Sequence, residues 1–208
     1  MRPASETFRI NMLSTYNVFA AAEVHDASRV VYASSETILG LPFDEPPAFA
    51  PIDETHPSRP ESSYSLAKLA GETIAGQFVP RPGTPYVGLR LSNILEPEDY
   101  AAFPDYWNDP HIRKWNLWSY VDARDVAAAC ELGLTAEVKG HEIAIIAAAD
   151  NCMTRDSAAL MAEVYPDVPI TRELRGRETL LAIDRAQSVL GYEPQYTWSD
   201  EIAGPLGA

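Results

Sequence analysis

The first half of the chain alternates between helical and strand-like spacing of its apolar residues. Apolar side chains recur every three or four positions over residues 5–25 and again over 63–78, which predicts two amphipathic helices. Apolar runs at 29–33 and 86–91 predict two short strands buried on both faces. The order helix, strand, helix, strand, with long crossovers between the strands, is typical of an α/β fold with a parallel sheet.

The second half continues this alternation with shorter elements. Helices are predicted over residues 121–135, 154–164 and 184–190, and a further strand over 141–147. Gly191 directly follows the last helix, which is a common way for a helix to end.

Two long segments lack a clear period. Residues 41–61 hold six prolines, and an irregular loop of this length in a compact domain usually serves function, so we expect a wall or lid near the site. Residues 96–119 combine prolines with six aromatic side chains. They either fill the core or cap a small polar ligand, and we favour the cap because few regular elements remain for them to fill.

Composition narrows the class of protein. A chain of 208 residues with 46% hydrophobic content can form one compact domain with a small appendage. No apolar run approaches the roughly 18 residues that span a bilayer, and the first residues lack the apolar core of a signal peptide. We therefore predict a soluble, cytoplasmic protein without membrane contact. The two cysteines have no metal-ligand neighbours in sequence, and no metal site is predicted.

The charge balance is strongly acidic. A formal net charge of −14 argues against nucleic acid as a partner, since phosphates attract the opposite sign. The basic residues are 13 arginines and only 3 lysines. High acidity with few lysines predicts adaptation to a high-salt cytoplasm, where screening tolerates self-repulsion. An ordinary acidic protein from a GC-rich genome is the alternative.

Candidate chemistry follows the predicted strands. Ser34 and Ser35 come at the end of the first strand and Asn93 follows the second, where parallel α/β proteins place their sites. Tyr64 and Lys68 lie one helical turn apart on the same face. An ammonium favours the phenolate form of a nearby tyrosine, and a serine hydroxyl can hold a substrate oxygen beside it, which suits proton transfer at a carbinol or carbonyl oxygen. The Tyr-x-x-x-Lys pair alone is weak evidence, because composition predicts about one chance occurrence in seven such chains.

Six segments, in order along the chain, carry a more specific pattern: residues 11–18, 31–35, 64–68, 89–93, 120–127 and 183–194. Together they resemble the extended short-chain dehydrogenase/reductases, the NAD-dependent epimerase/dehydratase family. The resemblance covers residues 5–200, and Ser14 stands where that family usually has glycine. It implies an α/β fold with a partial Rossmann-like parallel sheet. Residues 1–95 would form the C-terminal part of the Rossmann-like domain and residues 96–208 mainly a small, interleaved substrate-binding subdomain.

The resemblance also implies an enzyme, an NAD(P)-dependent oxidoreductase, with roles for particular residues. Tyr64 would be the acid/base, and Lys68 would favour its phenolate and bind the nicotinamide ribose. Ser35 would hold the reacting oxygen, and Asn11 would hold a water behind Lys68. Ser34 would contact the cofactor and Asn93 the substrate. The choice between NAD and NADP stays open.

The family's Gly-rich turn and pyrophosphate-binding helix should precede the first matched segment. The first glycine of this sequence is Gly40, so we expect the sheet to lack its N-terminal dinucleotide-binding half. One sheet edge would then be exposed, and NAD(P) binding weak or absent. A fragment or mis-started reading frame of a longer enzyme, a truncated paralogue and one half of a split protein would each explain this. We favour the first explanation, because the site residues are intact.

The substrate is expected to be small. Only 26 residues separate Asn93 from Tyr120, whereas nucleotide-sugar members of the family carry a longer segment there. The short segment looks more like uronate dehydrogenase and related small-sugar oxidoreductases. Arg113 is a candidate clamp for a carboxylate or hydroxyl, with a solvated surface arginine as the alternative.

Two other functions stay open: a nucleotide-sugar epimerase or dehydratase, and a truncated non-catalytic binding or dimerisation module. In the family the helices corresponding to 5–25 and 63–78 usually form a dimer interface. We therefore expect a homodimer through these two helices.

Overall fold

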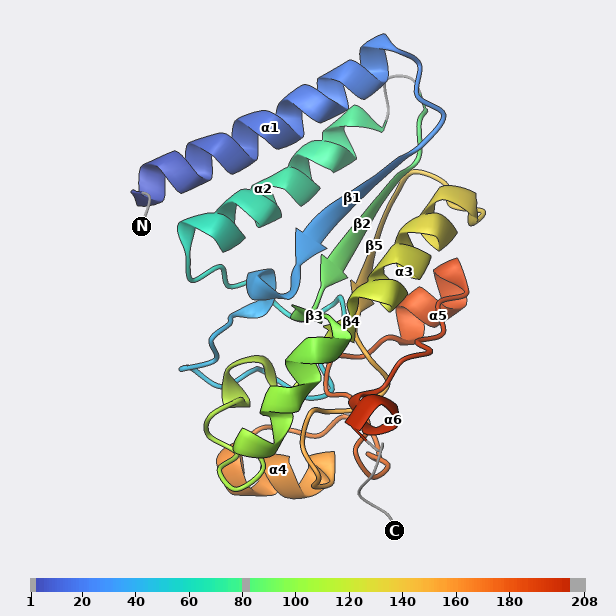
Figure 1. Cartoon of the computed structure of the whole chain (residues 1–208). Helices are drawn as coiled ribbons and strands as arrows, with labels where there is room; N and C mark the ends of the chain where they lie inside the picture. Colours follow the sequence, from blue (N-terminus) through green and yellow to red (C-terminus); the bar gives the residue numbers. More distant parts are fainter. Residues whose placement is uncertain (1–2, 80–82, 203–208) are drawn as a thin grey trace.

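A three-stranded parallel sheet stands at the centre of the computed structural model, which describes residues 3–79 and 83–202. The strands are β1 (Val30–Ser35), β2 (Tyr86–Leu91) and β5 (His141–Ile146), in the order β1-β2-β5. Val30 pairs with Tyr86, and Tyr86 with His141, so the carboxyl ends of all three strands meet at one edge of the sheet (Figure 1). No described strand pairs with the outer edge of β1.

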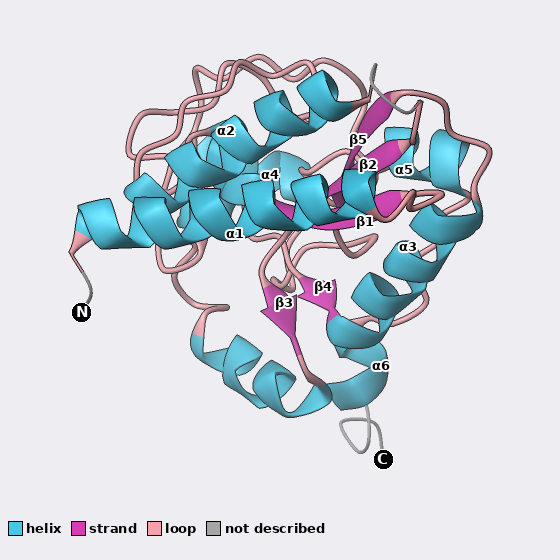
Figure 2. Cartoon of the chain, turned by 90° about the horizontal axis from the view of Figure 1, so that it is seen from above, coloured by secondary structure: helices cyan, strands magenta, loops and turns pink. Residues whose placement is uncertain are grey.

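Helices cover both faces of this sheet. α1 (Ala4–Val24) and α2 (Ser63–Phe78) pack side by side on one face, and α3 (Ala123–Thr135) and α5 (Asp184–Leu190) lie on the other (Figures 1 and 2). The start of α2 is fixed by a reciprocal cap. Ser62 Oγ accepts a hydrogen bond from Ser65 N at 3.0 Å, and Ser65 Oγ accepts one from Ser62 N at 2.9 Å.

The remaining elements lie beyond the carboxyl ends of the strands (Figure 1). β3 (Ile94–Leu95) pairs in parallel with β4 (Val121–Asp122). Two short helices are α4 (Ser157–Val164) and α6 (Trp198–Ile202). Three 3₁₀ segments complete the part of the chain that the structure describes: η1 (Glu36–Leu39), η2 (Pro97–Asp105) and η3 (Lys114–Asn116).

Most predicted elements are present with small shifts at their ends. α2, β2 and α5 have the predicted bounds, and Gly191 ends α5 with a φ of 71°. α4 begins three residues later than predicted. The side chain of Asn151 accepts from Met153 N and donates to Arg155 O, which holds a turn in front of the helix.

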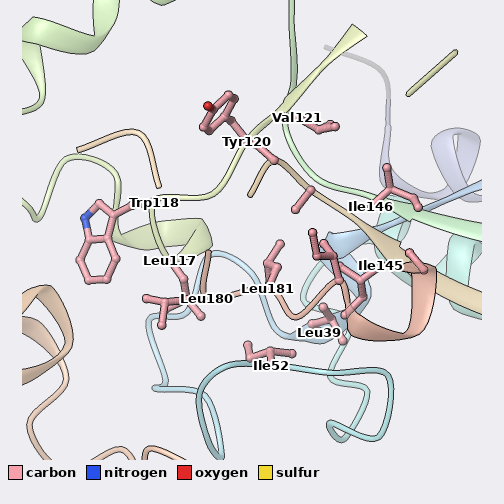
Figure 3. Close-up of a cluster of buried hydrophobic side chains, with 14 of the residues drawn as sticks. Leu39, Ile52, Leu117, Trp118, Tyr120, Val121, Ile145, Ile146, Leu180 and Leu181 are labelled. Carbon is pink, nitrogen blue, oxygen red and sulfur yellow. The ribbon is translucent and has the colours of Figure 1, made fainter. Parts of the chain in front are cut away.

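The main core draws on segments far apart in the sequence (Figure 3). Fully buried residues include Leu39, Ile52, Trp118, Ile145 and Leu181. They come from both sides of residue 95, so this cluster does not separate the two predicted domains, and the division stays a prediction. Across residues 3–79 and 83–202, no helix combines the length and apolarity needed to cross a membrane.

The proline-rich loop over residues 41–61 belongs to this core. Ile52 donates to Leu180 O at 2.8 Å and accepts from Ala182 N at 2.7 Å, and Ala50 N donates to Pro169 O at 2.9 Å. The loop contributes no residue to the pocket described below, so the prediction of a wall or lid was wrong. The loop instead contributes buried side chains to the core and hydrogen-bonds to residues far along the chain.

The aromatic segment over residues 96–119 is also largely core. Tyr100, Phe103 and Trp118 are buried, and Trp118 donates to Pro110 O at 2.7 Å. Among the six aromatic side chains only Trp115 lines the pocket. The predicted cap is therefore confined to one residue.

Candidate functional site

A hollow of about 380 Å³ opens where β1 and β2 end. Its lining comes from residues 33–37 and 91–94, together with Tyr64 at the start of α2 and Trp115. Parallel strands deliver their carboxyl ends to one edge, and the cap of α2 brings Tyr64 to that same edge. Four predicted site residues are thereby brought together: Ser34, Ser35, Tyr64 and Asn93.

A larger and more open hollow, of about 730 Å³, lies elsewhere on the molecule. It is lined by Asp150, Arg172, Arg177 and Glu178, among others, and by no predicted site residue. Two of its arginines are paired with acids in its lining: Arg172 with Glu178, and Arg177 with Asp150 at 3.3 Å. We place the site at the smaller hollow, where the predicted chemistry converges.

Ser35 ends β1 with its hydroxyl in a defined orientation. Its Oγ accepts hydrogen bonds from Thr37 N at 3.2 Å and from Thr37 Oγ1 at 2.9 Å. Both bonds use the oxygen as acceptor, so the Ser35 proton is available to an oxygen in the pocket. This is the geometry needed to hold a substrate carbonyl or hydroxyl.

Tyr64 and Lys68 lie on the same face of α2. Tyr64 is 38% exposed and lines the pocket, while the Lys68 Nζ lies 5.5 Å from the centroid of its ring. Lys68 Nζ donates to Ala33 O at 2.8 Å, and burial lowers the pKa of this ammonium. Lys68 does not itself line the pocket.

Ser34 is turned away from solvent into a buried network. Its Oγ donates to Glu72 Oε1 at 2.5 Å, and Glu72 also accepts two bonds from Arg90, at 3.0 and 2.9 Å. Glu72 lies one turn beyond Lys68 on α2, and Arg90 lies on β2. The network therefore fixes α2 against both strands that end at the pocket. The sequence analysis did not single out the Glu72–Arg90 ion pair. The visible signal was the position of Glu72, four residues after Lys68 on the same helix.

Besides Lys68, two predicted site residues lie outside the pocket lining. Asn11 is half-buried on α1 and donates to Thr7 O at 2.9 Å. Arg113 is buried, donates to Ser119 O at 3.1 Å, and stacks over Trp115 at 4.8 Å. The alternative of a solvated surface arginine was therefore wrong for Arg113.

Glu36 is the main pocket residue that the sequence did not single out. It directly follows Ser35, lines the pocket and is 3% exposed. Its Oε2 accepts from Ser92 Oγ at 2.7 Å and its Oε1 from Asn116 Nδ2 at 3.4 Å. Burial raises the pKa of Glu36 to about 7, against the opposing effects of these donors and of Arg113. The available signal was an acidic residue directly after a buried strand.

The residues present suit one end of a dinucleotide. Tyr64 and Lys68, a phenol and an ammonium one turn apart, fit a nicotinamide ribose. A pyrophosphate needs glycine at a strand end, so that backbone N–H groups can approach closely. The three strands of the described sheet are followed by Glu36, Ser92 and Ala147, with no glycine. Within residues 3–79 and 83–202, the pyrophosphate end therefore has no such cradle.

Comparisons with known proteins agree with this architecture. Residues 1–147 match the family model described as the NAD dependent epimerase/dehydratase family. A uronate dehydrogenase of Pseudomonas syringae pv. tomato is 28% identical over 142 residues, which are 68% of this chain and 46% of that protein. An L-arabinose 1-dehydrogenase (NAD(P)(+)) of Haloferax volcanii is 28% identical over 101 residues, covering 44% of this chain and 39% of the other.

The fold also matches solved structures. A short-chain dehydrogenase/reductase superfamily protein of Agrobacterium tumefaciens with bound NAD aligns with a TM-score of 0.70 at 20% identity. The alignment covers 98% of this chain and 74% of that one. The chain spans about half the length of the curated relatives it matches. Because the family model matches more than half of the chain, the chain that carries Ser35, Tyr64 and Lys68 belongs to the NAD-dependent epimerase/dehydratase family.

Proposed function

We propose that this chain carries the proton-transfer and substrate side of an NAD(P)-dependent oxidoreductase acting on a small sugar-like substrate. The observation that carries the proposal is the convergence of Ser35 and Tyr64 on one pocket, with the Lys68 Nζ 5.5 Å from the tyrosine ring. The uronate and L-arabinose dehydrogenases among its relatives support a small substrate.

Each side chain has its own role at one substrate carbinol. Ser35 donates its hydroxyl proton in a hydrogen bond to the reacting oxygen. Tyr64 acts as the base that takes the hydroxyl proton while the C–O bond becomes a carbonyl, with the Lys68 ammonium beside its ring. When bound, NAD(P)⁺ supplies the acceptor for the hydride that leaves the same carbon. Asn93, at the end of β2, would orient a further hydroxyl of the substrate.

Three further roles concern residues around the pocket. Asn11 would hold a water behind Lys68, and the packing of α1 against α2 favours this. Ser34 would contact the cofactor, although its hydroxyl is held by Glu72. Arg113 would act on the substrate through Trp115, over which it stacks.

A homodimer through α1 and α2 is a second proposal with its own observation. Leu13, Tyr16 and Val18 on α1 and Leu66 on α2 are 47% to 60% exposed in the single chain. Apolar side chains gathered on two adjacent helices are typical of a surface that another protein covers. The same surface supports the alternative function, a non-catalytic dimerisation module, in which the pocket would not turn over substrate.

Turnover separates the two functions. The purified chain is assayed for NAD(P)H formation at millimolar NAD(P)⁺ with a panel of aldoses, uronates and nucleotide sugars. We expect turnover with a small sugar, and a Tyr64→Phe variant should lose roughly 100- to 10,000-fold in kcat/KM. Tyr196→Phe is a matched control, because Tyr196 is similarly exposed, at 37%, and lies outside the pocket. Absence of turnover with every substrate would reject the enzymatic proposal for this chain, and equal losses in both variants would reject the role of Tyr64.

A further inference from the structure

We infer that this pocket selects neutral aldose-type sugars and rejects sugar acids, and that Glu36 makes the selection. The inference rests on the proposed function, because it concerns the substrate of that same site. It differs from what the similarity to uronate dehydrogenases alone would suggest.

The ionisable charge in the lining of the pocket is of one sign. Among the eleven residues that line it, Glu36 carries the only ionisable carboxyl, and no lysine or arginine is present. A sugar acid would bring a second carboxylate into a small hollow that offers it no cation. Like charges brought together at a site disfavour binding, and such repulsion is one way in which a site excludes a wrong ligand.

Glu36 is held in place at the pocket. One carboxyl oxygen accepts from Ser92 Oγ and the other lies within reach of Asn116 Nδ2. Its neighbours in η1, Ile38 and Leu39, are fully buried and fix the turn. The carboxyl therefore has no alternative position in solvent. Since its pKa is raised to about 7, it is mainly ionised at pH 8 and mainly protonated at pH 6.

Neither nearby cation lines the pocket. Arg113 is the charged group that acts on Glu36, and it lies outside the lining of the pocket. It donates to Ser119 O and stacks on Trp115 and Tyr106. Lys68 donates to Ala33 O and is placed beside Tyr64.

A neutral sugar finds suitable partners in the same hollow. The lining offers hydroxyls from Ser35 and Thr37 and an amide from Asn93. The rings of Tyr64 and Trp115 offer apolar faces for the C–H groups of a pyranose. Donors, acceptors and aromatic faces without an unpaired cation suit a polyol better than an anion.

The test measures sugar binding without dinucleotide. Saturation-transfer NMR and calorimetry compare two matched pairs, D-galactose with D-galacturonate and D-glucose with D-glucuronate, at pH 6 and pH 8. At pH 8 we expect the neutral member of at least one pair to bind the unmodified chain at least tenfold more tightly than its acid. The preference should shrink at pH 6.

A Glu36→Gln variant keeps the shape of the side chain and removes its charge. It should bind the acid and the neutral sugar with similar affinity at both pH values. Glu98→Gln, an exposed glutamate outside the pocket, should leave the preference unchanged. Melting temperatures of all proteins are measured first, so that a loss of binding is not confused with a loss of fold.

Three results would overturn the inference: equal or tighter binding of the acid by the unmodified chain, an unchanged preference in Glu36→Gln, or no binding of any of the four sugars. The proposed function is scored separately by NAD(P)H formation. A dehydrogenase that turns over uronates would therefore refute this inference and leave the proposed function standing.

Discussion

Glu36 offers the sharpest test of the electrostatics of the site. A buried carboxyl whose folded pKa is raised holds its proton in the folded state after the unfolded chain has released it. Between the ordinary value of 4.5 and about 7, the folded state therefore binds more protons, and stability falls as pH rises. At 1.36 kcal/mol per pKa unit, this interval corresponds to about 3 kcal/mol. Glutamine at this position has no such dependence.

The assay compares unfolding of the unmodified chain and Glu36→Gln from pH 5 to pH 8.5. The difference in stability between the two proteins should change by about 3 kcal/mol in favour of the variant as pH rises. For a chain of this size, that is a relative change in Tm of roughly 6 to 12 °C. Exposed Glu98→Gln is the control and should follow the unmodified chain throughout.

A constant difference across this range would show that Glu36 titrates near its ordinary value. The burial and the Ser92 and Asn116 contacts described for its carboxyl would then be wrong, and with them the selection against sugar acids.

Three further predictions concern packing and charge. Gly88→Ala should lower the free energy of unfolding in urea by about 1–3 kcal/mol, because a Cβ there would lie 2.6 Å from Tyr32 Oη and from Ile143 Cδ1. The control is Gly76→Ala in α2, where a Cβ would make only ordinary contacts, so this variant should be neutral or slightly stabilising. Equal effects of the two substitutions would contradict this packing. Glu72→Gln should lower the free energy of unfolding by about 3–5 kcal/mol, because it leaves the buried Arg90 unpaired. A decrease of less than about 1 kcal/mol would contradict the network. Molar KCl should raise the Tm if a net charge of −14 is destabilising through self-repulsion, and a Tm that is flat or falling with salt would contradict the high-salt prediction.

The regular part of the fold could be predicted because its signals are local. The helical period and the Ser62 cap define α2, and apolar runs define the strands. Parallel strands necessarily bring their carboxyl ends together, so the convergence of Ser35, Tyr64 and Asn93 followed from the element order. The residue pattern in six ordered segments predicted the family.

The irregular part could not be predicted, because its burial depends on contacts far along the chain. Ile52 is fully buried through bonds to residues 180 and 182, and nothing in the proline-rich loop around it has a period. Glu36 has the same difficulty: an acidic residue after a strand is as compatible with a solvated turn as with a carboxyl covered by Asn116, 80 positions away. Arg113 was chosen for its chemistry, and its stacking on Trp115 was invisible in sequence.

The bond from Lys68 to Ala33 also connects the chemistry of the site to the assembly of the sheet. Val30 N donates to Pro85 O, toward β2, and alternate residues of a strand point to opposite edges, so the Ala33 carbonyl points to the outer edge of β1. A strand that pairs at this edge would meet a carbonyl that already accepts from the Lys68 ammonium, and would share it, since a carbonyl oxygen has two lone pairs. The lysine beside Tyr64 therefore also occupies the edge of β1 with which no described strand pairs, so a strand added there would lie directly against a residue of the site.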